Sequence, residues 1–275
     1  MKETTIVSNI QCFFPIAIDE TIISEDELSA SYKEYLKLKK TTSATIPMFF
    51  YDWIELAANG QEKAKAFLSF CHTKIKHLWD TQCLDGNSLK KKIRDSILTM
   101  SKNGYPSYRD SLSELLLFDH LSGINNYKCL GIDFKIGNGK DSDIAFKNGN
   151  HIQLIEITNI HHLTGKNIIK MLKNRVEEKL KDKTKHKEEV EKYFSCLYPN
   201  TNVYISILPF IWAEPFDIAA ESSEINSVLK MKGDDLLPPM TLLCEQNAKS
   251  MKYSYQLSNL SYVLNKIKEL NQAKL

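Results

Sequence analysis

The chain has 275 residues, of which 43% are hydrophobic and 25% charged, a balance typical of an ordinary globular protein. Its formal net charge of +2 indicates neither a strongly basic nor an acidic protein. No stretch approaches the ~18 consecutive apolar residues of a membrane-spanning helix. Acidic residues flank the apolar patch near the N-terminus, which disfavours a signal peptide. We therefore expect a cytoplasmic protein without a membrane partner.

Several common kinds of site are excluded by the pattern of motifs. The six cysteines are scattered without a CxxC pair, whereas a disulfide framework or a zinc site needs closer spacings. The sequence has no P-loop and no GxGxxG, GxSxG or HExxH pattern. These absences exclude the commonest NTPase, dehydrogenase, hydrolase and zinc-protease classes.

The first part of the chain is predicted to be a run of helices. Ser24, followed by three acidic residues, is a helix start of the capping-box type. Pro47 is placed to open the next helix, and Asn59-Gly60 is a good stop for it. A further helix follows until Asp85-Gly86-Asn87 breaks it, and residues 88–101 complete the run. We expect residues 1–103 to form a helical N-terminal region.

The pattern changes after residue 104, where short β-rich runs alternate with helices. The glycine-containing turns between these runs favour tight connections. The expected elements are a helix at 108–121, strands at 128–136, 142–147 and 152–160, a lysine-rich helix at 166–194, a strand at 203–210 and a closing helix at 257–273. Residues 211–258 have no clear pattern. The sequence thus predicts an α/β (α+β) fold over residues 104–275, with the order α-β-β-β-α-β.

Three carboxylates occupy positions that predict a site. Glu114 has leucines and a phenylalanine at helical spacing around it, and Asp143 begins an apolar strand. Glu156 lies in HIQLIEITNI, which is apolar on both faces and so predicts a central, covered strand. A charge in such places needs a cation or hydrogen-bond donors. A salt bridge would also satisfy each residue, but the three together form the oxygen-rich set that Mg²⁺ or Mn²⁺ prefers.

These residues and their order resemble the PD-(D/E)XK nuclease superfamily over roughly residues 105–210. The resemblance implies a restriction-endonuclease-like core and a metal-dependent endonuclease that hydrolyses phosphodiester bonds of DNA or RNA. It also implies that Asp143 and Glu156 bind the metal with the backbone carbonyl of Ile157. Glu114 would then hold a second ion or orient a water molecule.

Two positions depart from the family's motif. Ser142 stands where the family has proline, and Thr158 stands where it usually has its catalytic lysine. The cap-snatching endonucleases of segmented negative-strand RNA viruses are similar here, since several carry Glu-x-Thr and take the lysine from the following helix. The resemblance therefore implies Lys170 or Lys173 as the catalytic lysine, with the choice between them open.

The lysine-rich helix has two interpretations. Residues 166–192 contain ten Lys or Arg against six Asp or Glu, a net +4, but the charges are spread around the helix. The helix is either a solvated surface or a surface that follows nucleic-acid phosphates. The sequence leaves the oligomeric state open, a homodimer included.

Three functions remain in competition at this point. The first is the active nuclease, and the second is a catalytically inactive nucleic-acid-binding module that retains the nuclease fold without its lysine. The third is a helical interaction or regulatory protein whose buried ion pairs resemble a site.

Overall fold

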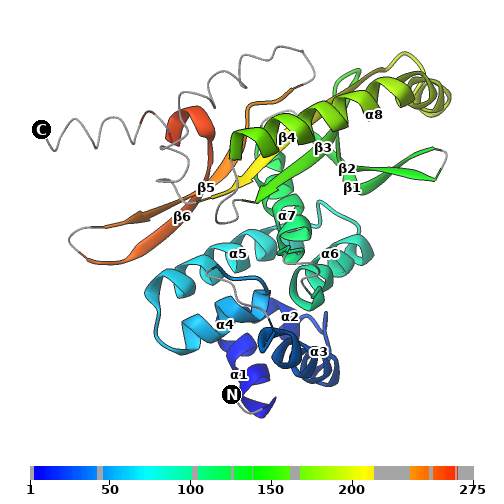
Figure 1. Cartoon of the computed structure of the whole chain (residues 1–275). Coiled ribbons are helices and arrows are strands. Elements are labelled where there is room, and N and C mark those ends of the chain that lie inside the picture. Colours follow the sequence, from blue (N-terminus) through cyan, green and yellow to red (C-terminus); the bar gives the residue numbers. More distant parts are fainter. Residues whose placement is uncertain are drawn as a thin grey trace, which may run out of the picture. The chain divides into compact units, whose positions relative to one another are not determined.

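The computed structural model describes residues 3–41, 46–100, 105–124, 127–137, 139–161, 168–213, 236–247, 250–263 and 265. The chain divides into two compact units. A helical unit comprises Met1–Asp119 and Glu245–Tyr255, and a sheet unit comprises His120–Cys244 and Gln256–Leu275. The boundary expected at residues 103 and 104 lies outside the described residues. Figure 1 traces the elements of both units along the chain.

The helical unit contains the run of helices predicted from Ser24 onward, two helices before it, and most of the helix predicted at 108–121, which the sequence assigned to the second region. They are α1 (Glu3–Phe13), α2 (Ile16–Asp19), α3 (Glu25–Lys39), α4 (Phe50–Ala58), α5 (Glu62–Thr81), α6 (Gly86–Leu98) and α7 (Tyr108–Ser122), which runs to the edge of this unit. Helix α3 begins with the expected capping box, because the Ser24 hydroxyl accepts from the Glu27 N–H and the Glu27 carboxylate accepts from the Ser24 N–H. Helix α5 ends at Gln82 in the left-handed conformation.

Helix α7 is buried on all sides. Leu115, Leu116, Leu117 and Phe118 follow one another and are 0% exposed. A helix that is apolar around its whole circumference belongs in a core rather than at a surface. A charged side chain at a buried position of this helix therefore needs a partner inside the protein.

The strands form one six-stranded sheet in the order β1-β2-β3-β4-β5-β6. Their bounds are β1 (Lys128–Gly137), β2 (Lys140–Asn148), β3 (His151–His161), β4 (Asn202–Trp212), β5 (Met240–Gln246) and β6 (Tyr253–Asn259). The pairs β1–β2 and β2–β3 are antiparallel, whereas β3–β4 and β4–β5 are parallel. The protein is thus a mixed α/β fold, and β3 is a central strand, as its apolar sequence predicts.

Helix α8 (Ile168–Leu197) packs on β1, β3 and β4, and it lies across the sheet in Figure 1. Two apolar clusters attach it. The first apolar cluster consists of Ile160, Leu172, Val176, Ile211 and Leu260. The second apolar cluster consists of Ala145, Ile152, Leu154, Val190 and Phe194. The β3 residues of the two clusters, Ile152, Leu154 and Ile160, lie on one face of the strand, and the α8 residues within each cluster are four apart.

The structure differs from the sequence prediction at the C-terminal end. Two strands, β5 and β6, lie within the segment that had no clear pattern. Residues 257–259 belong to β6, so the predicted helix at 257–273 begins too early. Helical residues follow from Leu260 to Val263, and most of the remaining predicted helix lies outside the described residues.

Among the described helices, none combines the length and apolar character needed to cross a membrane.

Candidate functional site

Glu156 forms an ion pair with a lysine of the helix that covers it. The Lys179 Nζ atom lies 3.1 Å from Glu156 Oε2. The side chains are 21% exposed for Glu156 and 37% exposed for Lys179. The Glu156 side chain is therefore half-buried where β3 meets α8, and the Lys179 ammonium balances its charge.

This ion pair lies between the two apolar clusters. Side chains alternate along a strand, so Glu156 shares a face of β3 with Leu154 and Ile160. Leu154 belongs to the second apolar cluster and Ile160 to the first. On α8, Lys179 likewise falls between Val176 and Val190. The sequence thus places a charged pair between the two apolar clusters that attach α8 to the sheet.

Asp143 lies where β2 and β3 separate. The β2–β3 pairing runs from Asn148–His151 to Ile144–Ile155. Beyond that pair, side chains of β2 bind the backbone of β3: Asp143 Oδ2 accepts from the Ile157 N–H at 2.7 Å, and the Ser142 hydroxyl lies 3.3 Å from the Ile155 carbonyl oxygen. We call this point the fork of the sheet.

The fork brings the two predicted metal ligands together. Continuing the β2–β3 register by one residue places Asp143 opposite Glu156. Residues that face each other in an antiparallel pair lie on the same side of a sheet. Ala145, two residues after Asp143, contacts the second apolar cluster on the α8 side. Asp143 and Glu156 are therefore on adjacent strands and on the face that α8 covers.

Glu114 has a different environment from the other two carboxylates. It belongs to α7 in the helical unit, whereas Asp143 and Glu156 belong to the sheet unit. Its Oε2 atom forms an ion pair with Lys92 Nζ of α6. Both side chains are nearly buried, with 11% of Glu114 and 9% of Lys92 exposed. The salt-bridge explanation that the sequence allows for Glu114 thus has a specific partner.

Lys170 and Lys173 are both exposed on α8. The lysine paired with Glu156 is instead Lys179, which sequence reasoning missed. The signal for it was present, because Lys179 lies seven residues after Leu172 and three after Val176. These are the spacings of the buried stripe of a helix, so a lysine there faces the sheet.

Another buried carboxylate, Asp119 of α7, joins two basic residues of α5. Its oxygens lie 2.6 Å from His77 Nδ1 and 2.8 Å from Lys74 Nζ, and its side chain is 2% exposed. Two further histidines lie on the same helices: His72 of α5 packs against the Phe14 ring, and His120 of α7 is exposed. Within the helical unit, the His77 ring is thus held by a contact with a buried carboxylate.

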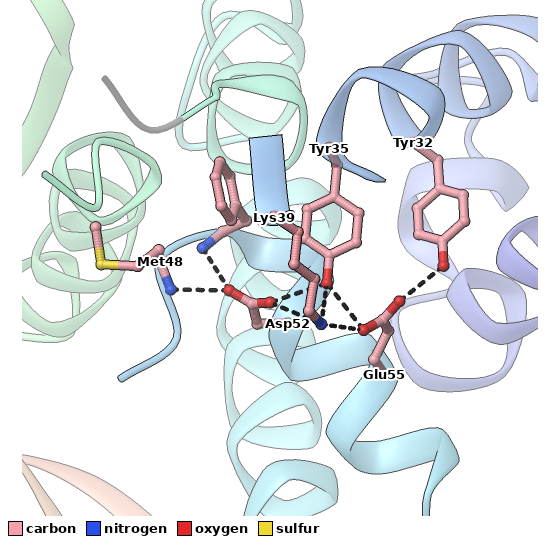
Figure 2. A network of polar contacts seen from close by, with 7 residues as sticks. Tyr32, Tyr35, Lys39, Met48, Asp52 and Glu55 are labelled. Atoms are coloured by element: carbon pink, nitrogen blue, oxygen red, sulfur yellow. Dashed lines mark hydrogen bonds and ion pairs between the residues drawn. The ribbon is translucent and has the colours of Figure 1, made fainter. Parts of the chain in front are cut away.

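A third polar group in the helical unit links α3 to α4 (Figure 2). Glu55 accepts hydrogen bonds from Tyr32 at 2.7 Å and Tyr35 at 2.9 Å, and it pairs with Lys39. Burial raises the pKa of Glu55, but the hydrogen bonds from Lys39 and the two tyrosines outweigh it and leave that pKa below its usual value.

The same group also fixes the start of α4. Asp52 accepts from the backbone N–H groups of Met48 at 2.9 Å and Phe49 at 3.0 Å, both before the first turn of the helix. Figure 2 shows the Asp52 and Glu55 carboxylates meeting at Lys39 and Tyr35. Each of the two carboxylates accepts hydrogen bonds from several donors. We therefore interpret this group as a structural link between α3 and α4.

The chemistry of the donors at the fork suits a hard cation. Among the described residues, no group of three or more His, Cys, Asp or Glu side chains gathers as metal ligands. Mg²⁺, however, keeps several water molecules and is commonly bound by one or two carboxylates with substrate phosphates. Asp143 and Glu156 supply that number, and the backbone around Ile157 supplies carbonyl oxygens beside them.

Comparisons with protein-family models, with curated proteins and with solved structures gave no match.

Proposed function

We propose that the protein is a divalent-metal-dependent nuclease whose site is formed by Asp143, Glu156 and Lys179 at the fork of the sheet. The observation that carries the proposal is the pairing of Lys179 Nζ with Glu156 Oε2 on the face where Asp143 also lies. Two carboxylates and a lysine are the residue types that metal-assisted phosphodiester hydrolysis requires.

The order of the elements supports the same proposal. The described chain runs α7, β1, β2, β3, α8, β4, with Asp143 on β2 and Glu156 on β3. This order resembles the core of the PD-(D/E)XK nucleases, in which the lysine usually follows the glutamate by two residues. We propose that Lys179 takes over that role from α8, because Thr158 occupies the usual position.

Each residue has a distinct task in the proposed reaction. Asp143, Glu156 and the Ile157 carbonyl would hold Mg²⁺ or Mn²⁺, which supplies an activated water and neutralises charge on the phosphate. Without the ion, Lys179 balances the negative charge of Glu156. In the reaction its ammonium would stabilise the charge that develops on the phosphate, an electrostatic task that needs a donor fixed in advance.

Glu114 is not part of the site in this proposal. Its charge is balanced by Lys92 in a nearly buried pair, so it needs no cation. We therefore assign Glu114 to stability, in place of the second-ion role that the resemblance implies.

The test is cleavage of labelled single- and double-stranded DNA and RNA in Mn²⁺, Mg²⁺ or EDTA. Asp143→Asn and Glu156→Gln keep the size of each side chain and an acceptor while removing the charge. We expect metal-dependent cutting by the wild type and at least a hundredfold loss in both variants. Arg175→Gln, at an exposed position of α8, is the matched control and should cut normally. Cutting that persists in EDTA, or in both carboxylate variants, would refute the proposed site.

One observation favours a second function, a catalytically inactive module that binds nucleic acid. Glu156 and Asp143 both have partners inside the protein, the Lys179 ammonium and the Ile157 N–H, so the fork is stable as a purely structural feature. Binding of the same labelled nucleic acids in EDTA, with no cutting in either metal, would favour this module. Binding should then weaken as the salt concentration rises.

A further inference from the structure

Thr158 carries a buried hydroxyl group for which the described residues provide no hydrogen-bond partner. The residue is 4% exposed, and its Oγ1 atom makes no hydrogen bond in the described part of the chain. Buried hydroxyls nearly always have a partner, which is either a protein group or an ordered water molecule. An unpartnered buried hydroxyl close to a charged pair indicates that Thr158 contacts a ligand or a water molecule.

The position of Thr158 follows from the pleat of β3. Residues two apart in a strand point to the same face and are roughly 6.6 Å apart along it. Thr158 therefore lies next to Glu156, on the side that α8 covers, and directly before Ile160 of the first apolar cluster. The apolar side chains of that cluster offer neither a donor nor an acceptor. The charged groups on this face include Glu156 and its partner Lys179.

Thr158 is too buried to contact a large ligand directly. It is 4% exposed, whereas the Glu156 side chain is 21% exposed, so it lies deeper than Glu156. Buried polar groups without a protein partner are commonly satisfied by a buried water molecule, which needs two to four polar partners. A hydroxyl can both donate and accept. Thr158 and the Glu156–Lys179 pair, on one face of β3, are groups of the kind that such a water contacts.

We propose that Thr158 Oγ1 is a positioning group that hydrogen-bonds to a water molecule in the hydration shell of the cation held by Glu156 and Asp143. This inference rests on the proposed function and adds Thr158 to it as a residue that supports metal binding. Thr158 thus has a task of its own at the position where related motifs carry lysine. In the absence of the cation the hydroxyl is poorly satisfied, so it stabilises the metal-bound protein more than the metal-free one.

The experiment compares three variants of the full chain in two measurements. Thr158→Val removes the hydroxyl and keeps the shape, and Thr158→Ser restores the hydroxyl. Thr241→Val is the matched control, because Thr241 is 1% exposed on β5 of the same sheet and its hydroxyl donates to the Ile211 carbonyl at 2.8 Å. The first measurement is the melting temperature in EDTA, and the second is the affinity for Mn²⁺ by calorimetry, without nucleic acid.

We expect Thr158→Val to melt at or above the wild-type temperature in EDTA and to bind Mn²⁺ about tenfold more weakly, the value of one hydrogen bond. Thr158→Ser should bind Mn²⁺ as the wild type does. Thr241→Val should melt at a lower temperature and keep the wild-type affinity for Mn²⁺.

Two results would overturn the inference, and they are distinguishable. If Thr158→Val melts lower, as Thr241→Val does, and binds Mn²⁺ normally, the water is structural and the proposed nuclease stands. If the wild type itself does not bind Mn²⁺, the proposed metal site fails and the role of Thr158 fails with it.

Discussion

Glu114 of α7 and Lys92 of α6 form an ion pair inside the helical unit, with no more than 11% of either side chain exposed. Two charges can leave water in this way because each offsets the cost of burying the other. The pair therefore explains how a glutamate is tolerated on a helix whose neighbouring residues are 0% exposed. Its energetic consequences are directly measurable.

Lys92→Met should destabilise the protein by about 3–5 kcal/mol, because it leaves Glu114 buried without its cation. Urea denaturation measures the loss. Adding Glu114→Leu to Lys92→Met should restore most of the stability, since two apolar side chains pack without a charge. If Lys92→Met is as stable as the wild type, the pair does not hold Glu114 in solution.

Lys179→Met should reduce nuclease cleavage about a hundredfold or more, the usual effect of removing one fixed donor from a charged transition state. Lys170→Met and Lys173→Met change exposed lysines of the same helix and should each alter the cleavage rate by less than about threefold. Single-turnover rates in Mn²⁺ separate these effects. A large loss in Lys170→Met or Lys173→Met, with Lys179→Met normal, would return the catalytic role to the lysines that the sequence first suggested.

Glu27 should make the helical unit sensitive to acid. The hydrogen bond from Arg94, followed by that from the Ser24 N–H, lowers the pKa of Glu27 to about 2 from its usual 4.5. A lowered pKa in the folded state means that the stabilisation is complete above pH 4.5 and is lost as the pH falls towards 2. Glu27→Gln should therefore lower the melting temperature at pH 7, and the gap to the wild type should narrow below pH 4.5. A gap that stays constant over this range would contradict the assignment.

Tyr35→Phe should cost more stability than Tyr32→Phe. The Tyr35 hydroxyl lies 2.9 Å from both Asp52 Oδ1 and Glu55 Oε2 and accepts from Lys39, whereas the Tyr32 hydroxyl contacts Glu55 alone in Figure 2. Burial and the two nearby carboxylates raise the pKa of Tyr35, so it remains a donor. We expect losses of about 2–3 kcal/mol for Tyr35→Phe and about 1 kcal/mol for Tyr32→Phe in urea denaturation. Equal losses would show that Tyr35 does not link the two carboxylates.

Local signals in the sequence predicted most of the elements. The Ser24 capping box, the glycine turns and the apolar run of β3 depend on neighbouring residues, so they can be read without knowing the fold. Strands β5 and β6 could not be found in this way. Strand β6 has the burial of a strand with one open face, and its polar sequence YSYQLSN lacks the apolar run of a central strand.

The candidate site was predicted only in part, because only some of its features depend on neighbouring residues in the sequence. The resemblance and the central position of β3 marked Asp143 and Glu156, and the structure brings them to one face. The partners of the charges depend on contacts between distant segments, which a single sequence does not encode locally. Lys92 lies 22 residues before Glu114, and Lys179 lies 23 residues after Glu156, so neither pair could be inferred from spacing alone.

The fork also divides the sheet into two parts with different support. Beyond Ile144–Ile155, β2 continues with β1 as a two-stranded hairpin, while β3 continues with β4 beneath α8. Two-stranded hairpins are marginally stable by themselves, and this one is attached to α8 through Phe134 and Ile136 of β1. Amide hydrogens between Phe134 and Ser142 should therefore exchange with solvent sooner than those from Ile152 to Ile155, which β2 and β4 enclose. The carboxylates of the candidate site lie at the border between a slowly and a rapidly exchanging region, where a bound cation would join the two strands and slow the exchange of both.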